Sequence, residues 1–98
     1  MTPPERAQEL VKRLRLQPHP EGGMYREIFR SGLTVLRQPD GQARSALTSI
    51  FFLLPRGACS RWHRVEADEA WHHYEGEPVD LLVLLPGATQ VVTWRLGA

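Results

Sequence analysis

Side chains able to do acid–base chemistry gather in one stretch, residues 57–76. It holds three of the four histidines, two of the three tryptophans and the only cysteine of the chain. Within it, His63 and Glu69 stand six residues apart. A carboxylate beside an imidazole can form a metal ligand set or a general acid–base pair. It can equally be a hydrogen-bonded polar pair inside a core. The residues alone leave these alternatives open.

Two predicted strands, residues 60–65 and 69–74, must position this pair. A turn at residues 66–68 joins them, so His63 and Glu69 flank the turn. Opposed residues on antiparallel neighbours lie about 4.5–5.5 Å apart between Cβ atoms. The two side chains can therefore face each other if they share a face of the sheet, and they are the candidate catalytic pair.

Other side chains near the pair follow from the alternation of a strand. Trp71 and His73 fall on the same strand face as Glu69, with His72 opposite. We predict that Trp71 and His73 contribute to ligand binding. His19, in a proline-rich loop, is predicted to be structural or exposed.

The rest of the chain predicts one helix followed by short strands. A capping box at Thr2–Glu5 and apolar residues at helical spacing predict an amphipathic helix over about residues 3–14. The predicted strands are short and bounded by turn residues, and they cover residues 24–30, 33–36, 45–54, 60–65, 69–74, 79–85 and 91–96. One helix and about seven short strands predict an all-β sandwich or barrel.

Three segments carry more specific expectations. Residues 45–54 have large apolar groups on both faces and are predicted to form a central strand. The segment Gln38–Gly41 has proline and glycine at its turn positions and is predicted to be a turn. Strict alternation over residues 24–30 predicts two mixed faces, one with Tyr25, Glu27 and Phe29 and the other with Met24, Arg26, Ile28 and Arg30.

Composition limits the class of protein. A length of 98 residues predicts a single domain, residues 1–98, with a modest core. A net charge of +1 with dispersed arginines argues against a nucleic-acid binder. One cysteine allows no intrachain disulfide and predicts a reducing compartment. The longest apolar run, residues 50–55, is too short to cross a bilayer, and no secretory signal is evident. We expect a cytoplasmic protein without a membrane partner.

The spacing of residues 57–76 resembles a known motif. Gly57, His63, Glu69 and Gly76 match the first cupin motif, with Val65 where that motif has a second histidine. Residues 16–27, 48–54, 60–64 and 68–76 are similar to the small cupin family labelled DUF985, or Cupin_5. The resemblance covers roughly residues 7–96.

The resemblance implies a fold and a pocket. The fold would be a cupin-type jelly-roll β barrel, usually dimeric, similar to sugar-nucleotide epimerases, so a homodimer is expected. The pocket would lie inside the barrel. Carried over by position, its lining would be Arg26, Thr48, Ile50, His63, Glu69 and Trp71.

Two departures from the cupin pattern change these expectations. Valine at position 65 supplies no metal ligand, so a metal-free pocket is favoured and no metal-binding residue is predicted. The second cupin motif is absent before Ala98, so we expect a partial barrel, truncated at its C-terminal end. A partial barrel would leave apolar side chains without cover, among them Leu82, Leu84, Val92 and Trp94.

Three functions compete at this point. The leading hypothesis is a small-molecule-binding cupin, of sugar epimerase or isomerase type, with His63 as base and Tyr25 or Tyr74 as acid. The first alternative is a metal-dependent oxygenase or hydrolase, which would require a divalent transition metal as cofactor. The second alternative is a non-catalytic binding or interaction module.

Overall fold

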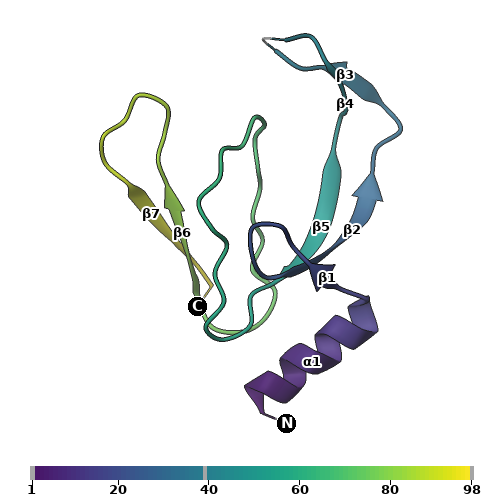
Figure 1. Ribbon diagram of the computed structural model, residues 1–98, viewed down its shortest axis with the longest axis vertical. Coiled ribbons are helices and arrows are strands. Elements are labelled where there is room, and N and C mark those ends of the chain that lie inside the picture. The colour runs from purple at the N-terminus through teal and green to yellow at the C-terminus, as the bar shows by residue number, and fades with distance from the viewer. Residues whose placement is uncertain (1, 39, 98) are drawn as a thin grey trace. The chain divides into compact units, whose positions relative to one another are not determined.

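The computed structural model describes residues 2–38 and 40–97 and divides the chain into two compact units, Met1–Arg64 and Val65–Ala98. In the described residues, the first unit contains α1 (Pro3–Leu14), β1 (Gln17–Pro18), β2 (Met24–Arg30), β3 (Thr34–Leu36), β4 (Ala43–Ser45) and β5 (Thr48–Leu53). The second unit contains β6 (Val79–Val83) and β7 (Val92–Leu96). The chain is therefore mostly β with one short N-terminal helix, as the sequence predicts (Figure 1).

Helix α1 begins and ends where its sequence predicts. The Thr2 hydroxyl accepts a hydrogen bond from the Glu5 N–H at 3.3 Å. Pro3 occupies the first turn, where the missing N–H has no helical acceptor to serve. Arg15 ends the helix in the left-handed conformation, with φ 55°. The hydrogen bond from the Glu5 N–H to the Thr2 hydroxyl thus fixes the start of the helix.

Strands β1, β2 and β5 form an antiparallel sheet in that order (Figure 1). In the part of the chain that the structure describes, β5 pairs only with β2 and lies at an edge. The prediction of a central strand is therefore wrong. Strand β5 has apolar residues on both faces, but these faces are only partly covered, since the first half of β5 is exposed. Strands β3 and β4 pair with each other as a separate two-stranded ribbon.

A β-bulge in β2 decides which side chains share a face of the sheet. Glu27 pairs with Ile50, but the next pair is Phe29 with Ser49, so Ile28 is an extra residue on β2. Directly opposed residues share a face, so the predicted alternation is wrong beyond Glu27. One face, here called the ion-pair face, carries Tyr25, Glu27, Arg30, Thr48, Ile50 and Phe52. The opposite face, here called the helix-side face, carries Met24, Arg26, Phe29, Ser49, Phe51 and Leu53.

Helix α1 lies on the side of the helix-side face. A groove of about 430 Å³ is lined by Ala7 and Val11 of the helix and by Met24 of β2, among other residues. The Arg26 guanidinium donates to the Leu14 carbonyl oxygen at 3.4 Å. Both Met24 and Arg26 belong to the helix-side face. The ion-pair face is thus the one turned away from the helix.

The segment that carries the predicted catalytic pair has no regular structure. Residues 54–78 are all described and contain no strand, so the strands predicted over 60–65 and 69–74 are wrong. A strand requires a neighbouring strand for its N–H and C=O groups. Here the Arg61 N–H instead donates to the Glu21 carbonyl at 2.7 Å, in the loop between β1 and β2.

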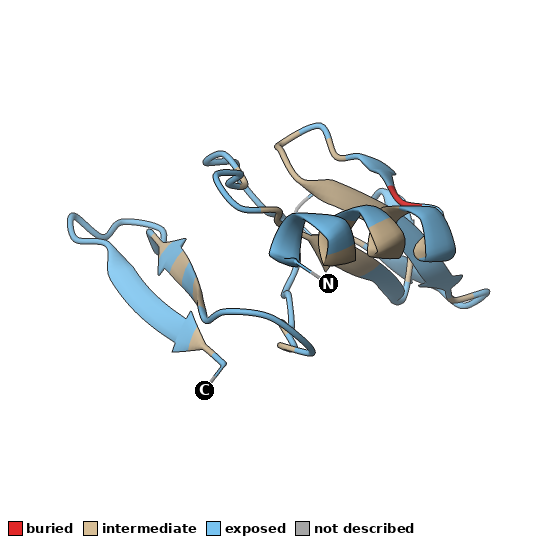
Figure 2. Ribbon diagram, turned by 90° about the horizontal axis from the view of Figure 1, so that it is seen from below, coloured by how far each residue is buried: buried red, intermediate tan, exposed pale blue. Residues whose placement is uncertain are grey.

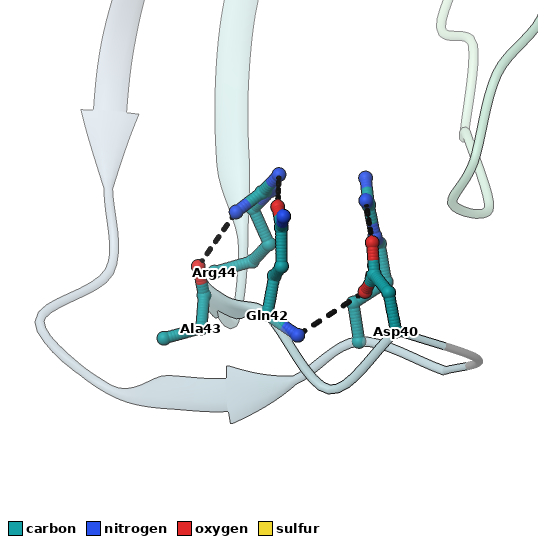
Figure 3. A network of polar contacts seen from close by, with 5 residues as sticks. Asp40, Gln42, Ala43 and Arg44 are labelled. Atoms are coloured by element: carbon teal, nitrogen blue, oxygen red, sulfur yellow. Dashed lines mark hydrogen bonds and ion pairs between the residues drawn. The ribbon is translucent and has the colours of Figure 1, made fainter.

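The connection between β3 and β4 is closed by its own polar groups (Figure 3). Arg37 donates through Nε to Asp40 Oδ1 at 3.1 Å and forms a second contact through Nη2. The Gln42 N–H also donates to Asp40 Oδ1 at 3.1 Å. Of the turn predicted over Gln38–Gly41, Pro39 lies outside the described residues.

In the second unit, the β6–β7 hairpin has one apolar face. The cross-strand pairs Val79–Leu96, Leu81–Trp94 and Val83–Val92 make up that face. The other face has an Arg95–Asp80 ion pair at 2.8 Å, and the hydrogen bond from Arg95 lowers the pKa of Asp80. Exposure is 49% for Leu82, 52% for Leu84, 41% for Val92 and 61% for Trp94, which confirms the prediction of uncovered apolar side chains.

A closed core is absent from the described residues. Leu16, at 8% exposure, is the one buried hydrophobic residue among them, and the described ribbon in Figure 2 is otherwise tan or pale blue. The expectation of a core for a domain of this length is therefore not met. The physical reason is that a sheet of two or three strands buries little surface by itself.

Candidate functional site

The predicted site residues are divided between the two units. Arg26, Thr48, Ile50 and His63 belong to the first unit, and Glu69, Trp71 and His73 to the second. The structure therefore does not bring His63 and Glu69 together within one unit.

His63 is exposed and its tautomer follows from its one described contact. Its Nδ1 lies 2.7 Å from the Arg61 carbonyl oxygen. A carbonyl only accepts, so Nδ1 carries the proton and donates. In the neutral ring, Nε2 then keeps its lone pair. His63 therefore presents a basic nitrogen to its surroundings, which is what a general base requires.

In the second unit, Glu69 is exposed whereas Trp71 and His73 are half-buried. His73 Nε2 lies 3.0 Å from the Glu77 carbonyl oxygen, to which it donates. A Cβ placed on Gly97 would lie 3.0 Å from the same nitrogen. His73 is thus packed against the end of β7, and its ring supports the connection into β6.

Of the residues implied for the pocket, Thr48 and Ile50 share the ion-pair face, but Arg26 does not. Arg26 is directed to the opposite face, where it donates to the carbonyl of the last helical residue, Leu14. A cation at a helix C-terminus is favourable, so Arg26 has a structural role there. On the ion-pair face, which carries Thr48, strand β2 instead contributes Tyr25, Glu27 and Arg30.

A two-point ion pair lies towards one end of the ion-pair face. Arg30 donates through Nε to Glu27 Oε2 at 3.1 Å and through Nη2 to Glu27 Oε1 at 2.7 Å. The Glu27 side chain is 38% exposed and that of Arg30 is 62% exposed. Ile50 lies opposite Glu27, and Thr48 lies opposite Arg30. The pair is oriented by two parallel hydrogen bonds and is still accessible from outside.

Aromatic rings gather at the other end of the same face. Tyr25 and Phe52 are cross-strand partners. The His19 ring stacks on Phe52 at 5.3 Å and meets Tyr25 edge-on at 4.8 Å between ring centroids. His19 Nδ1 accepts from the Glu21 N–H at 3.0 Å, so the neutral ring carries its proton on Nε2. The loop that follows β1 therefore forms a wall at this end.

That loop is tied to the segment that leads to His63. Arg61 donates through its N–H to the Glu21 carbonyl at 2.7 Å and through Nη2 to the Pro20 carbonyl. Gly22 has φ +111°, and a Cβ on it would collide with the Cys59 carbonyl oxygen. Only glycine combines this conformation with so close an approach. His63 thus lies two residues after Arg61, where its segment joins the wall.

Glu27, Arg30 and His19 are the residues that sequence reasoning missed. Strict alternation separates Glu27 from Arg30, and only the bulge at Ile28 puts them on one face. A glutamate and an arginine three residues apart gave no signal within a strand. The sequence predicts that His19 is structural or exposed, and its ring contacts confirm a structural role; its place in the wall of the ion-pair face is what the sequence does not predict.

The residues present do not fit the metal centre of metal-dependent cupins. Val65 has no donor atom at the position of the motif's second histidine. Within residues 2–38 and 40–97, no group of three or more His, Cys, Asp or Glu side chains is placed to hold an ion.

Comparison with known families supports the resemblance seen in the sequence. Residues 8–98 match the model of the Cupin superfamily (DUF985) family, Cupin_5. The chain belongs to this family. The match covers nearly all of this chain, including the ion-pair face, His63 and the β6–β7 hairpin.

The fold agrees with a solved structure. A hypothetical protein from Leishmania major matches with a TM-score of 0.86 and 36% sequence identity, over 94% of this cupin chain. The chain spans 57% of the length of that protein. Comparison with curated proteins found no match. Within the described residues, no helix has the length and apolar character needed to cross a membrane.

Proposed function

We propose that this cupin binds a small molecule on the ion-pair face of its β2–β5 sheet. The observation that carries the proposal is the convergence on one face of an accessible Glu27–Arg30 pair and an aromatic wall. Binding sites combine apolar and aromatic lining with a few oriented polar groups. The helix-side face is less suited to bind a ligand, because α1 lies on that side and Arg26 donates to the end of the helix.

The reaction we propose is a proton transfer of epimerase or isomerase type. His63 Nε2 takes a proton from a carbon next to a substrate carbonyl. The C–H electron pair forms a double bond to the carbonyl carbon, and the π pair of the carbonyl moves to its oxygen. The enolate then takes a proton on its opposite side from the Tyr25 hydroxyl, which inverts that carbon. Exchange with solvent restores both side chains.

Tyr25 is preferred to Tyr74 as the acid. Tyr25 lies on the ion-pair face beside His19, whereas Tyr74 is 81% exposed and belongs to the second unit. Glu69 and Trp71 stay proposed site residues on the family resemblance alone, and His73 stays one without that support. A homodimer and a cytoplasmic location belong to the same proposal; the exposed apolar side chains support the first and the single cysteine supports the second.

His63→Ala tests this proposal. The full chain is screened by thermal shift and by NMR against a panel of hexoses, hexose phosphates, amino acids and aromatic carboxylic acids. We expect a panel compound to bind the wild type and His63→Ala to lose that binding while its circular dichroism is unchanged. His72→Ala is the matched control, because His72 is also exposed. Equal affinity of His63→Ala and wild type would rule out the role given to His63.

A further inference from the structure

The ion-pair face is electrically balanced, and this limits the ligand that it can take. Of its six residues, only Glu27 and Arg30 are charged, and they bind each other through two hydrogen bonds. The His19 ring at its end accepts through Nδ1, which is the pattern of a neutral imidazole. The face therefore presents a pair of opposite charges and no surplus of either sign.

The unused hydrogen-bonding capacity of the face is mixed. Each Glu27 oxygen accepts one hydrogen bond from Arg30 and keeps a further lone pair. Arg30 Nη1 takes no part in these two bonds. The Thr48 hydroxyl, opposite Arg30, both donates and accepts. His19 adds an N–H on Nε2 at the aromatic end. Acceptors and donors thus stand side by side along the face.

A hydroxyl group matches such a surface because it donates and accepts at once. A phosphate does not match it, because all its oxygens accept and its charge meets the Glu27 carboxylate as well as Arg30. The aromatic end adds Tyr25 and Phe52, which suit the C–H face of a ring. From Thr48 to Phe52 the strand spans about 13 Å, enough for one sugar ring or two.

We propose that the ion-pair face binds an uncharged, hydroxyl-rich ligand of sugar type, and that the Glu27–Arg30 pair discriminates against its phosphorylated form. This inference rests on the proposed function and adds the class of ligand. Glu27 is the residue that sets the discrimination, because it neutralises the one cation on the face.

Titrations with uncharged hexoses and with the corresponding hexose 6-phosphates test the inference. The full chain is compared with Glu27→Gln, Arg30→Gln and Arg26→Gln. We expect wild type to bind a hexose about tenfold more tightly than its phosphate. Glu27→Gln frees Arg30, so the phosphate should gain on the order of tenfold in affinity. Arg30→Gln should lose hexose binding. Arg26→Gln removes the same charge from the helix-side face and should leave the affinity for both compounds unchanged.

The outcomes separate this inference from the proposed function. A wild type that prefers the phosphate, or a Glu27→Gln variant whose preference does not move, overturns the inference. Binding on this face by an amino acid or an aromatic acid, with no hexose binding, overturns the inference and leaves the proposed function standing. If no compound of the panel binds the wild type, both fail.

Discussion

Two arginine–carboxylate pairs, each formed by residues three positions apart in the sequence, have different surroundings. Glu27–Arg30 crosses the bulge in β2, and Arg37–Asp40 lies in the connection between β3 and β4. Asp40 also accepts from the Gln42 N–H, and the Arg37 and Gly41 N–H groups are bonded within the same connection. The second pair is therefore part of the closure of its own hairpin (Figure 3).

The first pair has different neighbours. Its two members bind each other, and beside them lie a hydroxyl, an aliphatic side chain and an aromatic wall from other parts of the chain. The same type of ion pair thus closes a turn in one place and is accessible to a ligand in another. The lesson is that backbone partners, and not the ion pair itself, separate a structural pair from a candidate binding pair.

The largest effect is expected from damage to the wall beside the first pair. Gly22→Ala must change a backbone with φ +111° and move the Cys59 carbonyl, so we expect a loss of about 2–4 kcal/mol in the free energy of unfolding. Gly41→Ala, beside the second pair, also has a positive φ, but its Cβ would meet no atom within 4 Å. It should cost only about 1 kcal/mol.

Urea unfolding of both variants measures this difference. A cost for Gly22→Ala no greater than that for Gly41→Ala would mean that the loop is not held against residues 59–61. Ligand binding should fall with Gly22→Ala and persist with Gly41→Ala, because only the first glycine belongs to the wall.

A smaller effect concerns the titration of the second pair. The hydrogen bond from Arg37 and then that from the Gln42 N–H lower the pKa of Asp40 to about 2, from a usual 3.8. Because the folded-state pKa is lowered, the contribution of Asp40 to stability is complete above about pH 4 and is lost as the pH falls towards 2. The carboxyl carbon shift of Asp40, followed by NMR, should show this midpoint.

Arg37→Gln is the variant that sharpens this prediction. It removes the main cause of the shift, so the Asp40 midpoint should rise towards 3.8. A midpoint already near 3.8 in the wild type would show that the pair does not form in solution. Affinity for panel compounds should be unaffected by Arg37→Gln, in contrast to Arg30→Gln.

Much of the fold could be predicted from local sequence. The capping box of α1, the strands near residues 24–30, 48–53, 79–83 and 92–96, and the cupin family all follow from local patterns or motifs. Residues 60–65 and 69–74 alternate like strands but have no neighbouring strand to pair with in this structure. A period-two pattern states a preference, whereas a strand also requires a partner.

The candidate site was less accessible to prediction. The family resemblance implies Thr48 and Ile50 as pocket residues; they share one face of the sheet and stay proposed site residues. Arg26 was assigned to their pocket, but it lies on the other face and binds the end of α1. The cause is the extra residue Ile28: a single bulge changes the side of every later residue in the strand, and no local composition marks it.

The most direct test of the central claim is methyl NMR of the full chain during titration with the panel compound that binds. The methyl groups of Thr48 and Ile50 report on the ion-pair face, and those of Met24 and Leu53 report on the helix-side face. We predict that the Thr48 and Ile50 signals shift with increasing ligand while those of Met24 and Leu53 stay in place. Shifts confined to Met24 and Leu53 would contradict the account and place the ligand beside α1.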